Sequence, residues 1–317
     1  MSKTGREMKK LIKSVFFFSI LIFAAASSCS IEKFALKKAA DALTGESSSN
    51  VFLTDNDPEL VGDALPFTIK MYESLMASIP EHYGLRLQTG MLYIMYANVY
   101  IQSPAEQLPD REFDKKESML DRAKNLYLRG RDYTLELLEM KHPGFLEHLK
   151  AKKYKLALDS VKRDDIPALY WASAGWVAAY SIDPFDMKLG ITLPQAEAMM
   201  NKILELDEHF NSGSVHDFLI LYYGSIPEYM GGSSKKARAH FKRAVELSKG
   251  RSASPYLSLA STVSVNEQNI KEFKALLKQA LKIDPDKYMS LRLQNTIYKR
   301  KAKWMLDHIE DYFVEVK

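Results

Sequence analysis

Apolar residues recur every three to four positions along most of the chain, the spacing of amphipathic helices, and strand-like alternation is hard to find. Proline and glycine separate these segments at fairly regular intervals, as residues that end helices should. The pattern predicts an all-α domain over residues 57–317. The predicted helices span residues 58–79, 83–102, 115–140, 144–160, 164–182, 192–207, 214–229, 234–248, 254–266, 269–282 and 287–314.

Several of the predicted helices share one spacing of small and large residues. In a tetratricopeptide hairpin the second helix carries a small residue, a large one and another small one, so that its two helices approach closely. Ala237-Phe241-Ala244 fits this spacing, and Phe273-Leu277-Ala280-Pro285 fits it with a bulky residue at the first position. Ala196-Met200-Ile203 is a weaker copy, and Ala123-Tyr127-Gly130 is an outlying one. The sequence therefore predicts irregular tetratricopeptide-like (TPR-like) helical hairpins that form a solenoid-like single domain.

Two segments expected to be first helices of hairpins, 167–182 and 214–230, are unusually apolar and aromatic and contain no Lys or Arg. Trp171 and Trp176 are five positions apart, about 500° around a helix, so they lie on different faces. The aromatic residues of these helices either form the core between repeats or line a ligand cavity or channel. The pattern leaves both interpretations open.

The first 28 residues have the three-part pattern of a bacterial export signal. A basic stretch precedes the apolar run 15–26, which is shorter than the roughly 20 residues of a membrane-spanning helix, and small residues follow. The only cysteine, Cys29, stands directly after them, where a lipoprotein signal is cleaved and the thiol is acylated. We expect a signal peptide over 1–28 and a lipidated cysteine with a Ser-rich tether over 29–56.

Charge is balanced once the signal is set aside. The chain has 44 Lys and Arg against 40 Asp and Glu, and residues 1–28 hold five of these bases and one acid, which leaves 39 of each. A chain of balanced charge has no general attraction for nucleic acid or for an anionic membrane surface. Nucleic acid is therefore not expected among the partners.

Motifs of catalysis and metal binding are missing from the sequence after residue 28. No HExxH, CxxC, GxSxG or GxGxxG occurs, and acylation of Cys29 would leave no thiol nucleophile. The seven histidines are scattered, and no two have the i,i+4 spacing that presents two ligands to one metal. The stretch 231–237 lacks the ending of a phosphate loop, and Ser233 or Ser234 as a helix N-cap explains it. We expect no enzyme, no cofactor and no metal.

Five stretches of the chain together resemble one family, the tetratricopeptide-repeat lipoproteins associated with tripartite ATP-independent periplasmic (TRAP) transporters, often called TatT. They are residues 96–107, 121–145, 167–180, 231–250 and 256–286. The resemblance implies irregular tetratricopeptide hairpins, a homotrimer, and a position beside a periplasmic solute-binding protein. It also implies a largely apolar pore through each protomer and supplies no catalytic residues.

These observations predict a lipid-anchored periplasmic accessory component of a TRAP transporter, which docks the solute-binding subunit and binds or conducts a hydrophobic solute. The residue after Cys29 is Ser30, which favours the outer membrane. The alternative is a TPR scaffold lipoprotein for envelope protein–protein contacts with no small-molecule ligand. The residues expected to line the pore are Tyr96, Tyr100, Tyr170, Trp171, Tyr222 and Tyr223.

Overall fold

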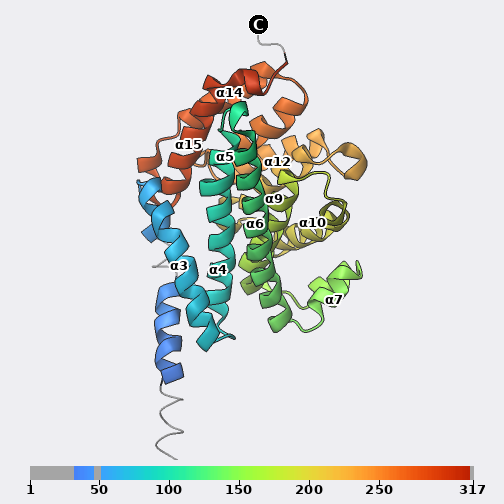
Figure 1. The fold of residues 1–317 in the computed structure, drawn as a ribbon. Helices are drawn as coiled ribbons and strands as arrows, with labels where there is room; N and C mark the ends of the chain where they lie inside the picture. The colour runs from blue at the N-terminus through green and yellow to red at the C-terminus, as the bar shows by residue number, and fades with distance from the viewer. Residues whose placement is uncertain (1–31, 46–50, 315–317) are drawn as a thin grey trace, which may run out of the picture.

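The computed structural model describes residues 32–45 and 51–314, and these ranges contain helices and no strand (Figure 1). The prediction of an all-α fold is confirmed. The α-helices of the domain are α3 (Pro58–Ser78), α4 (Tyr83–Tyr96), α5 (Ser103–Glu106), α6 (Phe113–Lys141), α7 (Phe145–Lys150), α8 (Tyr154–Asp159), α9 (Ile166–Ile182), α10 (Met187–Asp207), α11 (Ser214–Ser225), α12 (Ser234–Leu247), α13 (Ser254–Leu259), α14 (Ile270–Leu281) and α15 (Arg292–Asp307).

Shorter helical segments connect these helices. Two of them are π-helical, η1 (Ala97–Gln102) after α4 and η6 (Ala260–Ser264) after α13. The 3₁₀ segments are η2 (Asp110–Glu112), η3 (Arg163–Asp165), η4 (Phe210–Ser212), η5 (Glu228–Met230), η7 (Pro285–Lys287), η8 (Met289–Leu291) and η9 (Ile309–Asp311). Within the described residues, no helix has both the length and the apolar character needed to cross a bilayer.

Helices near one another in the chain pack side by side, α3 on α4, α4 on α6, α6 on α9 and α9 on α10 (Figure 1). The same holds for α11 on α12 and α13 on α14. Small residues of the predicted repeat spacing lie at these contacts, because Ala123, Ala237 and Ala244 are all buried. A Cβ added to Gly130 would lie 2.6 Å from the carbonyl oxygen of Gly90, so α6 approaches α4 as closely as glycine allows. The assignment of these pairs as tetratricopeptide repeats stays a prediction.

The last helix returns to the first (Figure 1). Leu293 of α15 belongs to the same hydrophobic cluster as the buried face of α3. Arg300 forms an ion pair with Glu59 of α3, and Lys301 Nζ lies 3.0 Å from the carboxylate of Glu106 on α5. Helices α3, α4, α6, α9, α11, α13 and α15 therefore follow one another around a closed ring, with an inside and an outside.

Most predicted helix ends agree with the structure to within a few residues, and three segments differ. The stretch 144–160 is divided into α7 and α8, with Lys152 between them at a left-handed φ of 58°. Helix α10 begins at Met187, ahead of the predicted start at 192, and keeps Pro194 inside it. The stretch 287–314 is not one helix but α15 flanked by 3₁₀ segments.

A further helix over residues 32–44 lies against the start of the domain. The Tyr72 hydroxyl donates a hydrogen bond of 2.7 Å to the Leu43 carbonyl, and His82 Nε2 lies 3.0 Å from the Asp41 carboxylate. Part of the segment that precedes α3 thus contacts α3 and α4. Cys29 and residues 1–28 lie outside the described residues, and the signal peptide and the lipid anchor stay predictions.

Candidate functional site

Three polar side chains lie deep within the ring and keep accessible surface: Tyr170 on α9, Asp217 on α11 and Tyr298 on α15. Each lies among enough protein atoms for burial to raise its pKa, yet each is only half-buried. Close-packed cores leave few voids that admit water, so side chains that are both enclosed and accessible border an internal space. We call these three residues, with Ser254 and Ser258 beside Asp217, the interior site.

Asp217 is held by hydroxyl groups and not by a cation. The Ser258 hydroxyl donates a 2.7 Å hydrogen bond to its Oδ1, and Ser254 is a second hydrogen-bonding neighbour. Among the described residues, no Lys, Arg or His forms an ion pair with it. Burial raises the pKa of the Asp217 carboxyl, and the two serine hydroxyls oppose that rise only in part.

Aromatic rings from α9 and η4 surround the same space. The Tyr170 ring meets Trp171 edge-on at 5.3 Å between ring centroids and lies 5.6 Å from Phe210. The Tyr170 hydroxyl hydrogen-bonds with Ser214, and its pKa is raised by burial and by the negative charge of Asp217. Burial and, after it, the negative charge of Asp217 also raise the pKa of the Tyr298 hydroxyl. Side chains from α9, α11 and α15 therefore converge on one region.

A chain of polar contacts joins η1, α6, α5 and α15. Asn98 Nδ2 donates to the Tyr127 hydroxyl at 3.0 Å, and that hydroxyl donates to Gln102 Oε1 at 2.5 Å. Gln102 in turn donates to Glu106 at 2.7 Å, and Glu106 pairs with Lys301. Asn98 and Gln102 belong to the π-helical segment η1, and such segments occur often at functional sites.

A family model with the description TRAP transporter T-component (TAtT) matches residues 54–313, which include all helices from α3 to α15. The chain belongs to this family. A protein of Treponema pallidum (strain Nichols), named only as uncharacterized, is 32% identical over 270 residues that cover 84% of each chain. The resemblance to TatT that the sequence predicts is confirmed, and the T-component has an accessory role in a TRAP transporter.

The six residues predicted to line a pore lie at three separate places in the structure. Tyr170 belongs to the interior site, and Trp171 touches it. Tyr96 and Tyr100 stack on each other at 5.8 Å, and the Tyr100 hydroxyl donates to the Pro58 carbonyl at 2.8 Å, against α3. This second pair lies on the side of the ring where α15 meets α3.

Tyr222 and Tyr223 form the third group and are buried, with 2% and 6% of their surface exposed. Their rings meet edge-on at 5.2 Å, and both hydroxyls donate to the Glu197 carboxylate, at 3.4 and 2.6 Å. They therefore join α11 to α10 and α12 as parts of the core.

Four residues of the interior site were missed by the sequence analysis: Asp217, Tyr298, Ser254 and Ser258. Asp217 is the only charged residue in α11, and a single acid in an otherwise apolar helix is a signal that could have found it. Tyr298 lies in a strongly basic stretch of α15 and gives no comparable signal. No described group of three His, Cys, Asp or Glu side chains is placed to hold a metal ion.

The turn from α9 to α10 presents exposed apolar side chains on the outside of the ring. Residues Met187 and Ile191 lie one helical turn apart on α10. η5 belongs to the same surface, because Met230 packs close to Gly190 of α10. We call this surface the end patch; its exposed fractions are 90% for Phe185, 72% for Met187, 60% for Ile191 and 89% for Tyr229.

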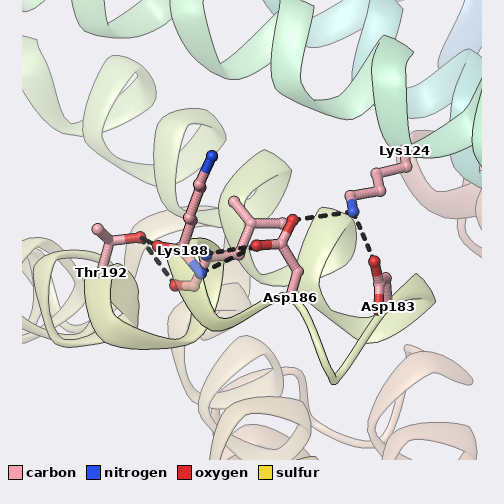
Figure 2. Close-up of polar contacts among 6 residues, drawn as sticks. Lys124, Asp183, Asp186, Lys188 and Thr192 are labelled. Atoms are coloured by element: carbon pink, nitrogen blue, oxygen red, sulfur yellow. Dashed lines mark hydrogen bonds and ion pairs between the residues drawn. The ribbon is translucent and has the colours of Figure 1, made fainter.

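Ion pairs fix the turn that carries the end patch (Figure 2). Lys124 of α6 lies 2.8 Å from the Asp183 carboxylate and 2.9 Å from that of Asp186. Asp186 also caps α10, accepting hydrogen bonds from the backbone of Lys188 and Leu189. These contacts lower the pKa of Asp186 below its usual range and hold the turn against α6.

Proposed function

We propose that this chain is a homotrimeric lipoprotein, anchored through Cys29 to the periplasmic face of the outer membrane, that docks the solute-binding subunit of a TRAP transporter. In this proposal the inside of the helical ring binds or conducts a solute with an apolar part. The observation that carries the proposal is the interior site, where enclosed side chains keep accessible surface. An internal space forfeits packing energy that a filled core would retain, and ligand binding is the usual use of such a space.

The aromatic surroundings of the interior site favour a solute over water alone. The Tyr170 ring contacts both Trp171 and Phe210 beside a few polar groups. Ligand sites in proteins combine mainly apolar and aromatic walls with a small number of orienting polar groups. Asp217 and Tyr298 supply such groups here.

Loss of ring contacts at Trp171 tests the solute role. We expect Trp171→Ala to reduce the amount of small molecule that co-purifies with the chain from Ser30 onward, with helicity unchanged. Native mass spectrometry before and after a detergent strip measures the bound mass, and the same spectra report the trimer. A ligand-free wild-type chain, or unchanged occupancy in a strongly destabilised variant, would assign Trp171 to the core and favour the scaffold alternative.

The end patch is the surface we assign to docking. Contiguous exposed apolar surface on a soluble domain commonly marks a protein interaction site. The Lys124 ion pairs restrain the turn before binding, which lowers the conformational entropy lost when a partner docks. The alternative function, a scaffold without a small-molecule ligand, would use this same surface.

A charge introduced into the end patch tests docking. We expect Phe185→Glu to weaken binding of the purified solute-binding subunit of the same transporter by at least about ten-fold, since a carboxylate would have to be desolvated. Phe67→Glu is the matched control, because Phe67 lies on α3 and is 73% exposed. Isothermal titration calorimetry measures both affinities. Equal effects of the two substitutions would remove the end patch from the docking surface.

A further inference from the structure

We propose that the interior site selects a solute that carries an organic ammonium group, with the Asp217 carboxylate as its counter-ion and the rings of Tyr170, Trp171 and Phe210 around it. This inference rests on the proposed function, because it names the class of solute that the same interior would take. The sequence predicts only an apolar solute, and the polar group of that solute is the new element.

The distribution of charge inside the ring favours a cation. Asp217 has serine hydroxyls as partners and no cation among the described residues. Helices α9 and α11 contain no Lys or Arg, and Lys301, the cation near Tyr298, already pairs with Glu106 at 3.0 Å. A buried charge is stable only with a partner of opposite sign, so an entering cation would satisfy Asp217 and an entering anion would face it unpaired.

The hydrogen-bonding capacity of Asp217 is not used up. An ionised carboxylate has about four acceptor positions, and the hydroxyls of Ser254 and Ser258 occupy two of them. An ammonium group brings up to about three donors, which match the remaining carboxylate positions and the tyrosine hydroxyl oxygens of Tyr170 and Tyr298. A solute carboxylate brings no donor and would compete with Asp217 for the hydroxyl donors of the site.

Tyr170 lies within electrostatic reach of Asp217, and its ring and the two rings that contact it add a second kind of recognition for a cation. The faces of tyrosine and tryptophan rings carry negative potential and attract a cation within about 6 Å of the ring centroid. Tyr170 lies between Trp171 and Phe210, with one ring at an edge-on angle of 88° and the other tilted by 57°. These contacts bring three aromatic rings together, and the faces of such rings bind ammonium ligands in aromatic cages.

Three compounds of nearly equal shape and different charge separate the possibilities. Phenethylamine is a cation at neutral pH, 2-phenylethanol is its neutral analogue and 3-phenylpropanoate its anionic analogue. We would titrate each into the chain from Ser30 onward, which keeps every described residue, and into Asp217→Asn, by isothermal titration calorimetry. Asp63→Asn is the control, because Asp63 is exposed on α3 and its substitution removes the same charge from the outside of the ring.

We expect phenethylamine to bind more tightly than both analogues. The affinity for phenethylamine should fall at least about ten-fold in Asp217→Asn, while the affinity of this variant for 2-phenylethanol stays unchanged. Asp63→Asn should bind all three compounds as the wild type does. If Asp217→Asn does not fold, Tyr170→Leu should show the same selective loss for the amine.

Other results would overturn the inference in distinguishable ways. If 3-phenylpropanoate binds more tightly than phenethylamine, or if Asp217→Asn leaves the affinity for phenethylamine unchanged, the ammonium solute is rejected. The proposed binding or conduction of an apolar solute is not affected by either result. Binding of none of the three compounds, by a chain that still docks its solute-binding subunit, would reject both the ammonium solute and the solute-binding half of the proposed function.

Discussion

Two histidines on neighbouring helices form a contact that requires at least one of the rings to be neutral. His216 of α11 and His240 of α12 approach at 2.8 Å between their Nδ1 atoms, and His216 Nε2 lies 3.1 Å from Glu208. Burial lowers the pKa of both rings, that of His240 to about 4. Arg243, bound to Glu208 through two nitrogen atoms, and Lys236 over the nearby Tyr223 ring are the cations that oppose a further positive charge.

We therefore expect the free energy of unfolding to fall as the pH drops from about 6.5 toward 4. In that window the histidines of the unfolded chain are protonated, whereas those of the folded chain stay neutral because their pKa is lower. The folded state therefore loses stability relative to the unfolded state. Because the His240 ring is half-buried and partly screened by solvent, we expect a loss of about 1 to 2 kcal/mol.

Urea unfolding at pH 7, 6, 5 and 4.5 measures this dependence. His240→Gln should flatten the curve, whereas the control His209→Gln, at an exposed position, should leave it unchanged. Below this window the Glu208 carboxylate, whose pKa lies at about 2, still holds Arg243. An equal acid response in wild type and His240→Gln would show that other groups dominate.

Some residues of the candidate site could be predicted from the sequence and others could not. The aromatic enrichment of α9 and α11 was visible in the sequence, and it marked Tyr170 and Trp171 together with Tyr222 and Tyr223. Helical periodicity could not separate the pairs, because burial of the second pair depends on Glu197 of another helix accepting both hydroxyls. Contacts between helices distant in sequence decide which aromatic residues are core.

At the scale of helices, close approach depends on glycine at the contact of α4 and α6. A Cβ on Gly130 would stand 2.6 Å from the Gly90 carbonyl and 2.7 Å from an Ile94 side-chain carbon. Backbone cannot yield as a flexible side chain does. We expect Gly130→Val to lower the free energy of unfolding by about 2 kcal/mol or more, as overpacking of a tight contact does.

Chemical denaturation followed by circular dichroism measures the effect of Gly130→Val, and Gly45→Ala is the control. A Cβ at Gly45 would meet its nearest atom at 3.4 Å, an ordinary contact. A neutral or stabilising Gly130→Val would mean that α4 and α6 can separate without loss, and that the close contact does not set their spacing.

Helix ends were predictable where a local side-chain signal exists. Ser233 caps α12 through a hydrogen bond to the Lys236 backbone nitrogen, as predicted. The predicted start of α10 at 192 is wrong, because Asp186 caps a helix that begins at Met187 and keeps Pro194 within it. The break in 144–160 contains Lys152 at positive φ, and 287–314 divides into α15 and 3₁₀ segments; neither change is marked by a glycine or proline. Long-range packing fixes those breaks.

At the scale of the whole molecule, closure of the ring joins residues that are more than 200 positions apart. In an open array, each helical pair contacts and stabilises only its neighbours, so the two ends can unfold independently. Here Leu293 of α15 packs in the cluster of Val61 and Leu65 from α3, while Met305 of the same helix packs in the larger cluster. The two ends of the domain should therefore open together, and the interior site should persist only while they are joined.

Leu293→Ala and Met305→Ala test this coupling, since both remove a side chain that is at most 3% exposed from one helix. Each substitution should cost about 2 to 5 kcal/mol, so stability alone does not distinguish them. Amide hydrogen exchange does, because Leu293→Ala should speed exchange in α3 as well as α15, whereas Met305→Ala should act on α14 and α15 and spare α3. Unchanged exchange in α3 after Leu293→Ala would mean that the ring is held at its seam by the Arg300–Glu59 and Lys301–Glu106 ion pairs alone. In that case high salt, which screens exposed pairs, should open the ring and reduce solute binding without unfolding the helices.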